Sequence, residues 1–276
     1  MNGVLAVNKP SGMTSFDVVK MISRALKVKA GHTGTLDPMA TGVMLVCVGK
    51  ATKLVPYLMA SQKTYQATIT LGIKTDSKDI TGDVIETAPV IFFNQKQAHD
   101  VCQSMIKTYM QQVPKVSAVR VDGKRLYQTK AEVELPMREV TIFDCQLLTH
   151  DQSTLTYEAT VSKGTYIRVL SEEIASLLQG NIGTTSALVR TQNHVIHLRE
   201  TQSIQEAIDQ PRWLDLRELL SHIPIIDVDD PTFIYHGKTK EFACDQDRIC
   251  LFYNDQPMAI YQRNQDNIYK SERGLF

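Results

Sequence analysis

The sequence predicts an α+β fold: a mixed, largely antiparallel β-sheet with helices, followed by a small β-rich C-terminal module. Strand-like and helix-like runs intermix without the regular βαβ spacing that builds a parallel sheet. The composition changes near HIPIIDVDDP (222–231), and the segment beyond is short, acidic and rich in strand-forming residues. A chain of 276 residues can bury one large core together with a small second one.

The first third of the chain shows the clearest local patterns. Residues 3–9 (GVLAVNK) read as a strand, and Ser15 is placed to cap a helix whose apolar residues recur at helical spacing. A glycine-rich loop at 31–42 leads into a strand at 43–49. We expect a short helix interrupted by Pro56 at 50–60, and a strand at 63–72.

The middle of the chain continues with a predicted helix from about Gln95 to Tyr109. Residues 115–130 (KVSAVRVDGKRLYQTK) are basic, and Asp122-Gly123 marks a hairpin turn, so this segment is a plausible phosphate-contacting ribbon. Strands follow at 140–149 and 154–162, then a helix to about Leu178 and a strand-like run at 187–198.

The composition argues against membrane insertion, secretion and metal binding. No run approaches the roughly 18 apolar residues of a membrane span, and the N-terminus has no leader-like pattern, so we expect a cytoplasmic protein. The five cysteines are scattered and predict reduced thiols. His194 and His197 lie three residues apart, but on a strand-like run, which favours ordinary histidines over metal ligands.

Charge is distributed unevenly along the chain. Residues 1–70 contain 8 basic and 2 acidic residues, whereas residues 200–276 contain 8 basic and 14 acidic residues. A basic N-terminal quarter suits a polyanion such as RNA or DNA, although a solvated helix face gives the same count.

Nucleotide-binding signatures are missing. The VGKAT segment has Met44 and Ala51 where a phosphate-binding loop needs glycine and Ser or Thr, and no G-x-G-x-x-G occurs. The loop GHTGTLDPMATG remains, with a single carboxylate at Asp37. Asp37-Pro38 could simply begin a turn; alternatively, a glycine-hinged loop could present one carboxylate and one imidazole to a ligand.

Taken together, the motifs resemble the TruB family of tRNA pseudouridine synthases. GHTGTLDPMATGVM is similar to the catalytic loop of that family. The likeness continues in order through VNKPSGMTSFDVV, GKATKLVPYL, KTYQATITLGIKTDSKDITGD, PKVSAVRVDGKRLY, and SKGTYIRVL followed by ALVRT, and covers roughly residues 3–200.

The resemblance implies a sheet of the pseudouridine synthase type and isomerisation of uridine 55 in the tRNA T loop to pseudouridine. It implies no cofactor and no metal, because the reaction involves no net redox change. Asp37 would be the nucleophile, attacking C1′ or removing a C2′ proton. Arg168 would pair with Asp37, and Tyr65 would stack on the target base.

The resemblance also implies residues that bind the substrate. The enzyme would flip the uridine out of the T loop, His32 would enter the vacated space, and Tyr166 and Leu188 would line the uracil pocket. Further residues are candidates for phosphate contacts, which set affinity and salt dependence: Lys9, Lys53, Lys124 and Arg125.

Two departures from the family pattern concern RNA binding. After Tyr127 the family often continues with Ala-Arg-x-Gly, which is absent here, although Lys130 could supply the charge. The C-terminal module looks smaller than the PUA domain of some relatives. We therefore expect a catalytic domain at 1–222, with an RNA-contacting insert at about 112–138, and a small PUA-like domain at 223–276.

The expected partner is the T arm of tRNA, and the sequence implies no protein partner, no membrane and a monomer. One alternative is a tRNA-binding or RNA-folding protein of the same fold without turnover, which the presence of Asp37, Tyr65 and Arg168 disfavours. Another is an enzyme acting on free uridine, which would not need the basic helix or the 115–130 segment.

Overall fold

The computed structural model describes residues 3–59, 62–117, 120–121, 124–125 and 134–275. The chain divides into two compact units. Unit 1 contains Met1–Asp37, Val43–Ala60 and His194–Phe276, and unit 2 contains Pro38–Gly42 and Ser61–Asn193. The chain therefore passes from one unit to the other inside the glycine-rich loop, directly after Asp37.

Unit 2 is built on long antiparallel strands in the order β12-β4-β11-β10-β7. Their bounds are β4 (Lys63–Leu71), β7 (Thr108–Gln112), β10 (Met137–His150), β11 (Thr154–Val161) and β12 (Gly183–Asn193). The first residues of β3 (Thr41–Val48) add a parallel pairing, Thr41 with Val189 and Gly42 with Arg190. A mixed, largely antiparallel sheet was predicted, and it is confirmed.

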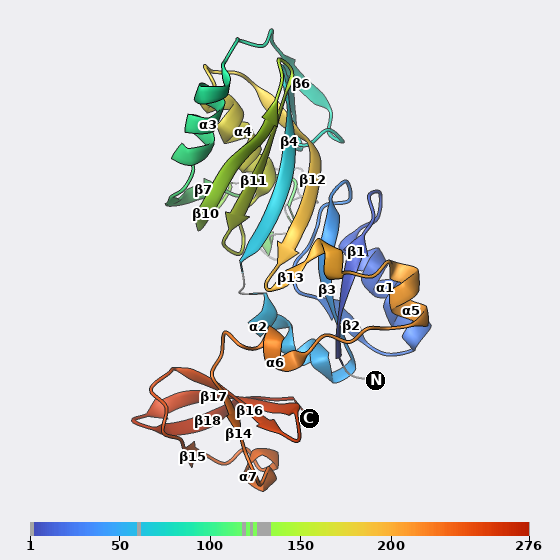
Figure 1. Ribbon diagram of the computed structural model, residues 1–276, viewed down its shortest axis with the longest axis vertical. Helices are drawn as coiled ribbons and strands as arrows, with labels where there is room; N and C mark the ends of the chain where they lie inside the picture. Colours follow the sequence, from blue (N-terminus) through green and yellow to red (C-terminus); the bar gives the residue numbers. More distant parts are fainter. Residues whose placement is uncertain (1–2, 60–61, 118–119, 122–123, 126–133, 276) are drawn as a thin grey trace. The chain divides into compact units, whose positions relative to one another are not determined.

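Two helices pack on one face of this sheet. Helix α3 (Gln95–Ser104) contacts β10, helix α4 (Ile167–Leu177) contacts β4 and β12, and the two helices contact each other (Figure 1). The hydroxyl of Tyr157 on β11 lies 2.9 Å from that of Ser171 on α4. Since Tyr157 pairs with Ala67 of β4, the face that carries Ala67 is the one under α4.

Two short hairpins complete unit 2. Strands β5 (Ile73–Thr75) and β6 (Val84–Thr87) pair antiparallel, as do β8 (Arg120–Val121) and β9 (Lys124–Arg125). The second pair has the direction reversal that Asp122-Gly123 predicted, although these two turn residues lie outside the described residues.

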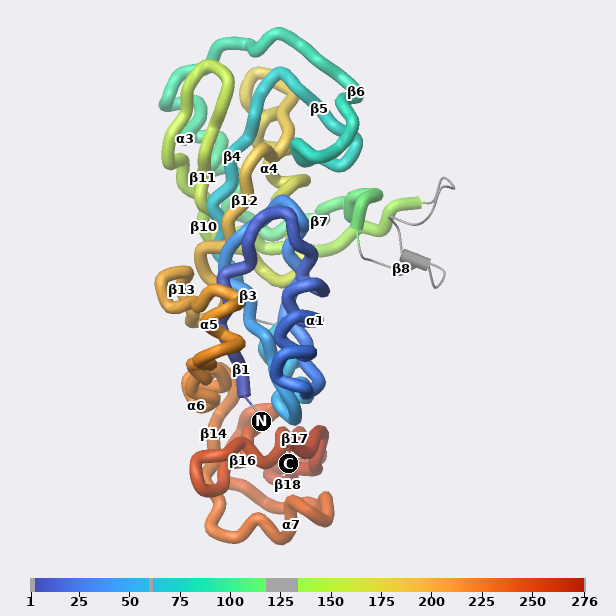
Figure 2. The backbone as a smooth tube through the Cα atoms, turned by 90° about the vertical axis from the view of Figure 1, so that its right-hand side faces the viewer, coloured from blue at the N-terminus to red at the C-terminus, as the bar shows by residue number. Residues whose placement is uncertain are grey.

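Unit 1 begins with β1 (Gly3–Lys9), after which the chain reverses and returns through α1 (Ser15–Leu26) (Figure 2). The N-cap of α1 is Thr14, which forms a capping box with Asp17, so the prediction that Ser15 caps this helix was wrong. Strand β2 (Ala30–His32) pairs antiparallel with β3. The apolar face of α1 packs against β1 and β3 in one hydrophobic cluster.

The segment after β3 forms the 3-10 helix η1 (Gly49–Leu54) and then α2 (Val55–Leu58). Pro56 stands in the first turn of α2, where its missing N–H costs nothing, so it begins a helix and does not interrupt one. The third part of unit 1 begins with short elements: β13 (Ile196–His197), η3 (Leu198–Glu200), α5 (Ile204–Asp209) and α6 (Leu216–Leu219).

The C-terminal region of unit 1 is a five-stranded sheet in the order β14-β16-β17-β18-β15. Its elements are β14 (Ile225–Asp227), α7 (Thr232–Tyr235), β15 (Lys240–Glu241), β16 (Arg248–Tyr253), β17 (Gln256–Gln265) and β18 (Ile268–Gly274). Phe252 and Ile260 join a core that also holds Val4 and Leu45. The β-rich module therefore packs against other parts of unit 1, as expected; the functional boundary at 222/223 stays a prediction.

Candidate active site

The loop of residues 31–42 begins on β2 and ends on β3. His32, half-buried, is the last residue of β2, where it pairs with Val46. Its Nδ1 accepts a hydrogen bond from the backbone N–H of Gly34, at 3.2 Å. A neutral imidazole in this arrangement carries its proton on Nε2, which leaves that nitrogen as the donor.

Asp37 is half-buried, and the residue before it is firmly held. The hydroxyl of Ser15 donates to the carbonyl oxygen of Leu36 at 3.0 Å and accepts from its N–H at 2.8 Å. Ser15 and Leu36 are both buried. The loop is thus anchored immediately N-terminal to its single carboxylate.

The other end of the loop is anchored in unit 2 by Gly42. This glycine has a φ of +108°, and a Cβ there would lie 2.3 Å from the carbonyl oxygen of Arg190. Only glycine combines such a backbone conformation with this close approach of two strands. Gly42 thereby keeps Thr41 and Gly42 paired with Val189 and Arg190.

Tyr65, Leu188 and Arg190 share the sheet face that packs under α4. Arg190 pairs with Tyr65 and Leu188 with Ala67 in the register of β12 and β4. Arg190 is fully buried; its Nη1 donates to the Tyr65 hydroxyl at 3.4 Å, and its guanidinium carbon lies 5.9 Å from the centre of the Tyr65 ring. The structure therefore brings two of the predicted site residues, Tyr65 and Leu188, onto one surface.

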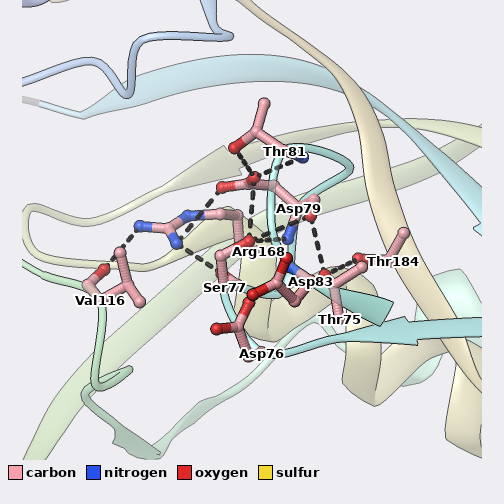
Figure 3. Close-up of polar contacts among 9 residues, drawn as sticks. All are labelled: Thr75, Asp76, Ser77, Asp79, Thr81, Asp83, Val116, Arg168 and Thr184. Atoms are coloured by element: carbon pink, nitrogen blue, oxygen red, sulfur yellow. Dashed lines mark hydrogen bonds and ion pairs between the residues drawn. The ribbon is translucent and has the colours of Figure 1, made fainter. Parts of the chain in front are cut away.

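Arg168 stands on the first turn of α4, 3% exposed, within a dense polar network (Figure 3). Its Nη1 donates to the carbonyl oxygen of Ser77 at 2.6 Å and lies 3.4 Å from Oδ2 of Asp79; its Nη2 donates to the carbonyl oxygen of Val116 at 3.0 Å. The other carboxylate oxygen of Asp79 accepts from Ser77 and Thr81. Asp79 therefore balances the charge of Arg168 within unit 2.

Asp37 belongs to unit 1, whereas Arg168 and Tyr65 belong to unit 2. The pairing of Asp37 with Arg168 accordingly stays a prediction.

Tyr166 directly precedes α4 and is half-buried. The side-chain amide of Gln111 holds its backbone from both sides: Oε1 accepts from the Tyr166 N–H at 2.8 Å, and Nε2 donates to its carbonyl oxygen at 3.3 Å. Gln111 in turn donates to the hydroxyl of Tyr109, which donates to Glu173 of α4. Strand β7 thus fixes the start of α4, and with it the backbone at Arg168.

The predicted phosphate contacts have different environments. Lys9 is fully buried, and its ammonium donates to the carbonyl oxygens of Pro10 at 2.9 Å and Met13 at 2.6 Å. A direct phosphate contact by Lys9 does not fit this conformation, because the ammonium is enclosed by its own turn. Lys53 is half-buried in η1.

The remaining cationic candidates, Lys124 and Arg125, lie on β9, beside β8. Tyr127 and Lys130, on which the departure from the family pattern rests, lie outside the described residues.

Three residues that matter for this geometry were missed from the sequence: Ser77, Asp79 and Arg190. A buried arginine requires a carboxylate or several carbonyl groups, so the acidic motif TDSKDITGD was the available signal for Asp79. Arg190 carried no such signal, because only the register of β12 against β4 sets it beside Tyr65.

None of the helices in the described residues is long and apolar enough to cross a membrane. Within the same residues, no group of three or more His, Cys, Asp or Glu side chains could hold a metal ion. His194 bonds instead to the carbonyl oxygen of Leu219 and to His222.

Comparisons with known proteins match both the sequence and the fold. The family model described as "TruB family pseudouridylate synthase (N terminal domain)" matches residues 20–167. The tRNA pseudouridine synthase B of Oenococcus oeni is 36% identical over 99% of this chain and 98% of its own length. The one of Bacillus subtilis is 41% identical over 81% of this chain and 78% of its own.

Among solved structures, the crystal structure of a Cbf5-Nop10-Gar1 complex contains a chain of similar fold. The TM-score is 0.74 at 20% identity, and the match covers 99% of this chain and 85% of that chain. At this identity the likeness concerns the fold alone. The family match, together with curated relatives 36% and 41% identical over most of the chain, shows that this chain belongs to the TruB family of pseudouridylate synthases.

Proposed function

We propose that this protein isomerises uridine to pseudouridine at position 55 in the T loop of tRNA, with the carboxylate of Asp37 as nucleophile. Membership of the TruB family and relatives named tRNA pseudouridine synthase B support the isomerisation and the tRNA substrate. The target position, the residue roles and a cytoplasmic, monomeric enzyme that recognises the T arm complete the proposal.

The observation that carries the role of Asp37 is the anchoring of its loop at both ends. Ser15 holds Leu36 on one side, and the pairing of Thr41 and Gly42 with β12 holds the other. A turn that merely connected two strands would not need two such anchors. A covalent catalyst does, because a small misplacement of the nucleophile costs orders of magnitude in rate.

The reaction requires one carboxylate and involves no net oxidation or reduction of the substrate. Asp37 attacks C1′ of the ribose or removes a proton from C2′, and the bond between N1 and C1′ breaks. The uracil turns and C5 bonds to C1′. This step breaks the bond between Asp37 and C1′ or, on the second route, returns the proton to C2′, so that the carboxylate is regenerated. C5 then releases its proton to solvent and N1 takes one up. The atoms of substrate and product are the same, so no cofactor enters the reaction.

The residues on the face under α4 suit the detached base. Tyr65 offers a ring on which the uracil stacks, and the hydrogen bond from Arg190 fixes the tyrosine hydroxyl. Leu188 and Tyr166 line the pocket. The uridine must first leave the T loop, at an unstacking cost of a few kcal/mol, and His32 fills the space that it leaves.

The test measures tritium release from an unmodified tRNA transcript that contains 5-³H-uridine. The wild-type protein should release one tritium per tRNA, because the C5–H bond is replaced by the new glycosidic bond. Release should stop when the T-loop uridine is replaced by cytidine or when Asp37→Asn is used. Asp37→Asn should still bind tRNA within about tenfold of wild type, since the carboxylate acts in chemistry more than in docking.

Each unexpected result would contradict a different part of the proposal. Wild-type tRNA binding without tritium release would overturn the enzymatic proposal and favour a binding-only protein. Release by Asp37→Asn at the wild-type rate would remove Asp37 from the nucleophile role. Release that persists after replacement of the T-loop uridine would place the target elsewhere in the tRNA.

A further inference from the structure

The hydroxyl of Ser15 is not used by the helix that it begins. Thr14 caps α1: its Oγ1 accepts from the Asp17 N–H at 3.1 Å, and the Asp17 carboxylate accepts from the Thr14 N–H at 3.0 Å. Ser15 is 2% exposed, and its hydroxyl turns instead to Leu36, 21 residues later in the chain. The two neighbouring side chains therefore do different tasks, one local and one long-range.

In its contact with Leu36, the hydroxyl of Ser15 acts both as a hydrogen-bond donor and as an acceptor. Oγ donates to the Leu36 carbonyl oxygen at 3.0 Å and accepts from the Leu36 N–H at 2.8 Å. Among short side chains, only a hydroxyl offers a strong donor and a strong acceptor from one atom. Leu36 is 3% exposed, so without this hydroxyl two buried backbone groups would lose their partner, and the loop would have to move to find water.

The carbonyl group of Leu36 lies in the same peptide plane as the nitrogen and Cα of Asp37. A hydrogen bond that fixes this carbonyl therefore fixes the position of Cα of Asp37 and the direction from which the chain enters that residue. This contact by itself sets neither the φ angle of Asp37 nor its two side-chain torsions. The Leu36 N–H, held by the same Oγ, prevents rotation of the preceding peptide plane.

We propose that Ser15 is a positioning residue for Asp37: its hydroxyl orients the peptide plane from which the nucleophile projects. This inference rests on the proposed role of Asp37. Ser15 touches no substrate in this scheme, and it acts only through the backbone of Leu36. Its contribution should therefore appear in the chemical step and not in the affinity for tRNA.

The experiment compares Ser15→Ala with Thr14→Ala, an adjacent substitution that also removes one hydroxyl from the start of α1. Thr14→Ala breaks the capping box but leaves the contact with Leu36 intact, so it controls for damage to the helix. Single-turnover tritium release gives the rate of chemistry, filter binding gives the Kd for tRNA, and thermal unfolding gives Tm for both variants.

For Ser15→Ala we expect a single-turnover rate about 10- to 100-fold below wild type, with Kd for tRNA within about threefold. Thr14→Ala should react within about twofold of wild type although its Tm falls. If Ser15→Ala does not fold, Ser15→Cys replaces it; a thiol is a weaker donor and acceptor, so the rate should again fall at unchanged Kd.

Two results would overturn the inference. One is a single-turnover rate of Ser15→Ala, or of Ser15→Cys in its place, that equals that of Thr14→Ala. The other is a loss of rate that is explained entirely by weaker tRNA binding. Asp37→Asn, measured in parallel, distinguishes failure of the proposed role of Asp37 from failure of the proposed role of Ser15. If Asp37→Asn retains activity, the role of Asp37 as nucleophile fails. If Asp37→Asn is inactive while Ser15→Ala is fully active, only the role of Ser15 is rejected.

Discussion

Nη1 of Arg168 lies 3.4 Å from Oδ2 of Asp79, and their side chains are only 4% and 6% exposed. Asp79 does not depend on Arg168 for its orientation, because Ser77 and Thr81 hold its other oxygen (Figure 3). A buried ion pair is stable only when the remaining donors and acceptors are satisfied as well. The turn between β5 and β6 thus holds the Asp79 carboxylate in position to pair with Arg168 of α4.

Asp79→Asn should destabilise the protein by about 3 kcal/mol, because it removes the buried carboxylate charge that lies beside the guanidinium of Arg168. Turnover should fall as well, if Arg168 acts at the site. Urea unfolding measures the first effect and tritium release the second. Asp83→Asn is the matched control: Asp83 is exposed on the same turn, so the change should stay within about 0.5 kcal/mol. Equal stability of the two variants would contradict the importance of this pair.

Gly42→Ala should lower the free energy of unfolding by about 3 kcal/mol or more. The new Cβ would clash with the backbone of Arg190, and the positive φ would add backbone strain. Gly180→Ala separates the two contributions. Gly180 has a φ of +81° but nothing within 4 Å of its Cβ position, so only strain of about 1 kcal/mol remains. Thermal unfolding of both variants measures the difference, and equal losses would show that the close approach to β12 is unimportant.

Lys63 should make stability depend on pH. Burial lowers the pKa of Lys63 to about 8, and the charges of Arg190 and Lys163 add to this effect. Between pH 8 and pH 10.5 the unfolded chain holds a proton that the folded protein does not, so the free energy of unfolding rises with pH across this window. The shift corresponds to about 3 kcal/mol in total.

Lys63→Met should therefore be more stable than wild type at pH 7, and the difference should shrink as the pH rises toward 10.5 and vanish above it, where the lysine is neutral in both states. Lys163→Met, a change at an exposed position, should keep most of the rise. Urea unfolding at several pH values measures both. A constant difference between Lys63→Met and wild type from pH 7 to 10.5 would contradict the lowered pKa.

Lys124→Ala and Lys9→Met should separate a lysine that contacts phosphate from one that supports a turn. Lys124→Ala should weaken tRNA binding and reduce the slope of log K against log salt by about 1. Lys9→Met should leave that slope unchanged and lower Tm, because the ammonium of Lys9 bonds to Pro10 and Met13. Binding titrations at several salt concentrations test both. An unchanged slope for Lys124→Ala would remove it from the phosphate contacts.

The middle of the chain shows how sequence patterns fail at element ends. A helix was expected from Gln95 to Tyr109, but α3 ends at Ser104, and residues Thr108–Gln112 form β7. The reason is pairing with β10, in which Thr108 lies opposite Thr141 and Gln112 opposite Met137. The partner strand comes about 25 residues later, so no local periodicity could reveal it.

The ordered motifs indicated the family before the structure, and the comparisons confirm it. The roles that the motifs suggest for Asp37, Tyr65 and Arg168 stay predictions. The alternation of residues in β4 and β11 reflects the two faces of a sheet. Such features depend on neighbours in the chain: helical or strand periodicity, turn residues, and a motif with its spacing.

The tertiary structure alone decided which groups each side chain meets. Ser15 was expected to cap a helix and instead holds Leu36. Asp79 was not foreseen as a partner of Arg168, whose expected pairing with Asp37 stays a prediction. Arg190 lies beside Tyr65 because of the strand register. Sequence specifies what a side chain can donate or accept. Its partner depends on which distant strands and turns the tertiary structure brings beside it. Burial then requires each of these polar groups to be paired, because an unpaired buried polar group is costly.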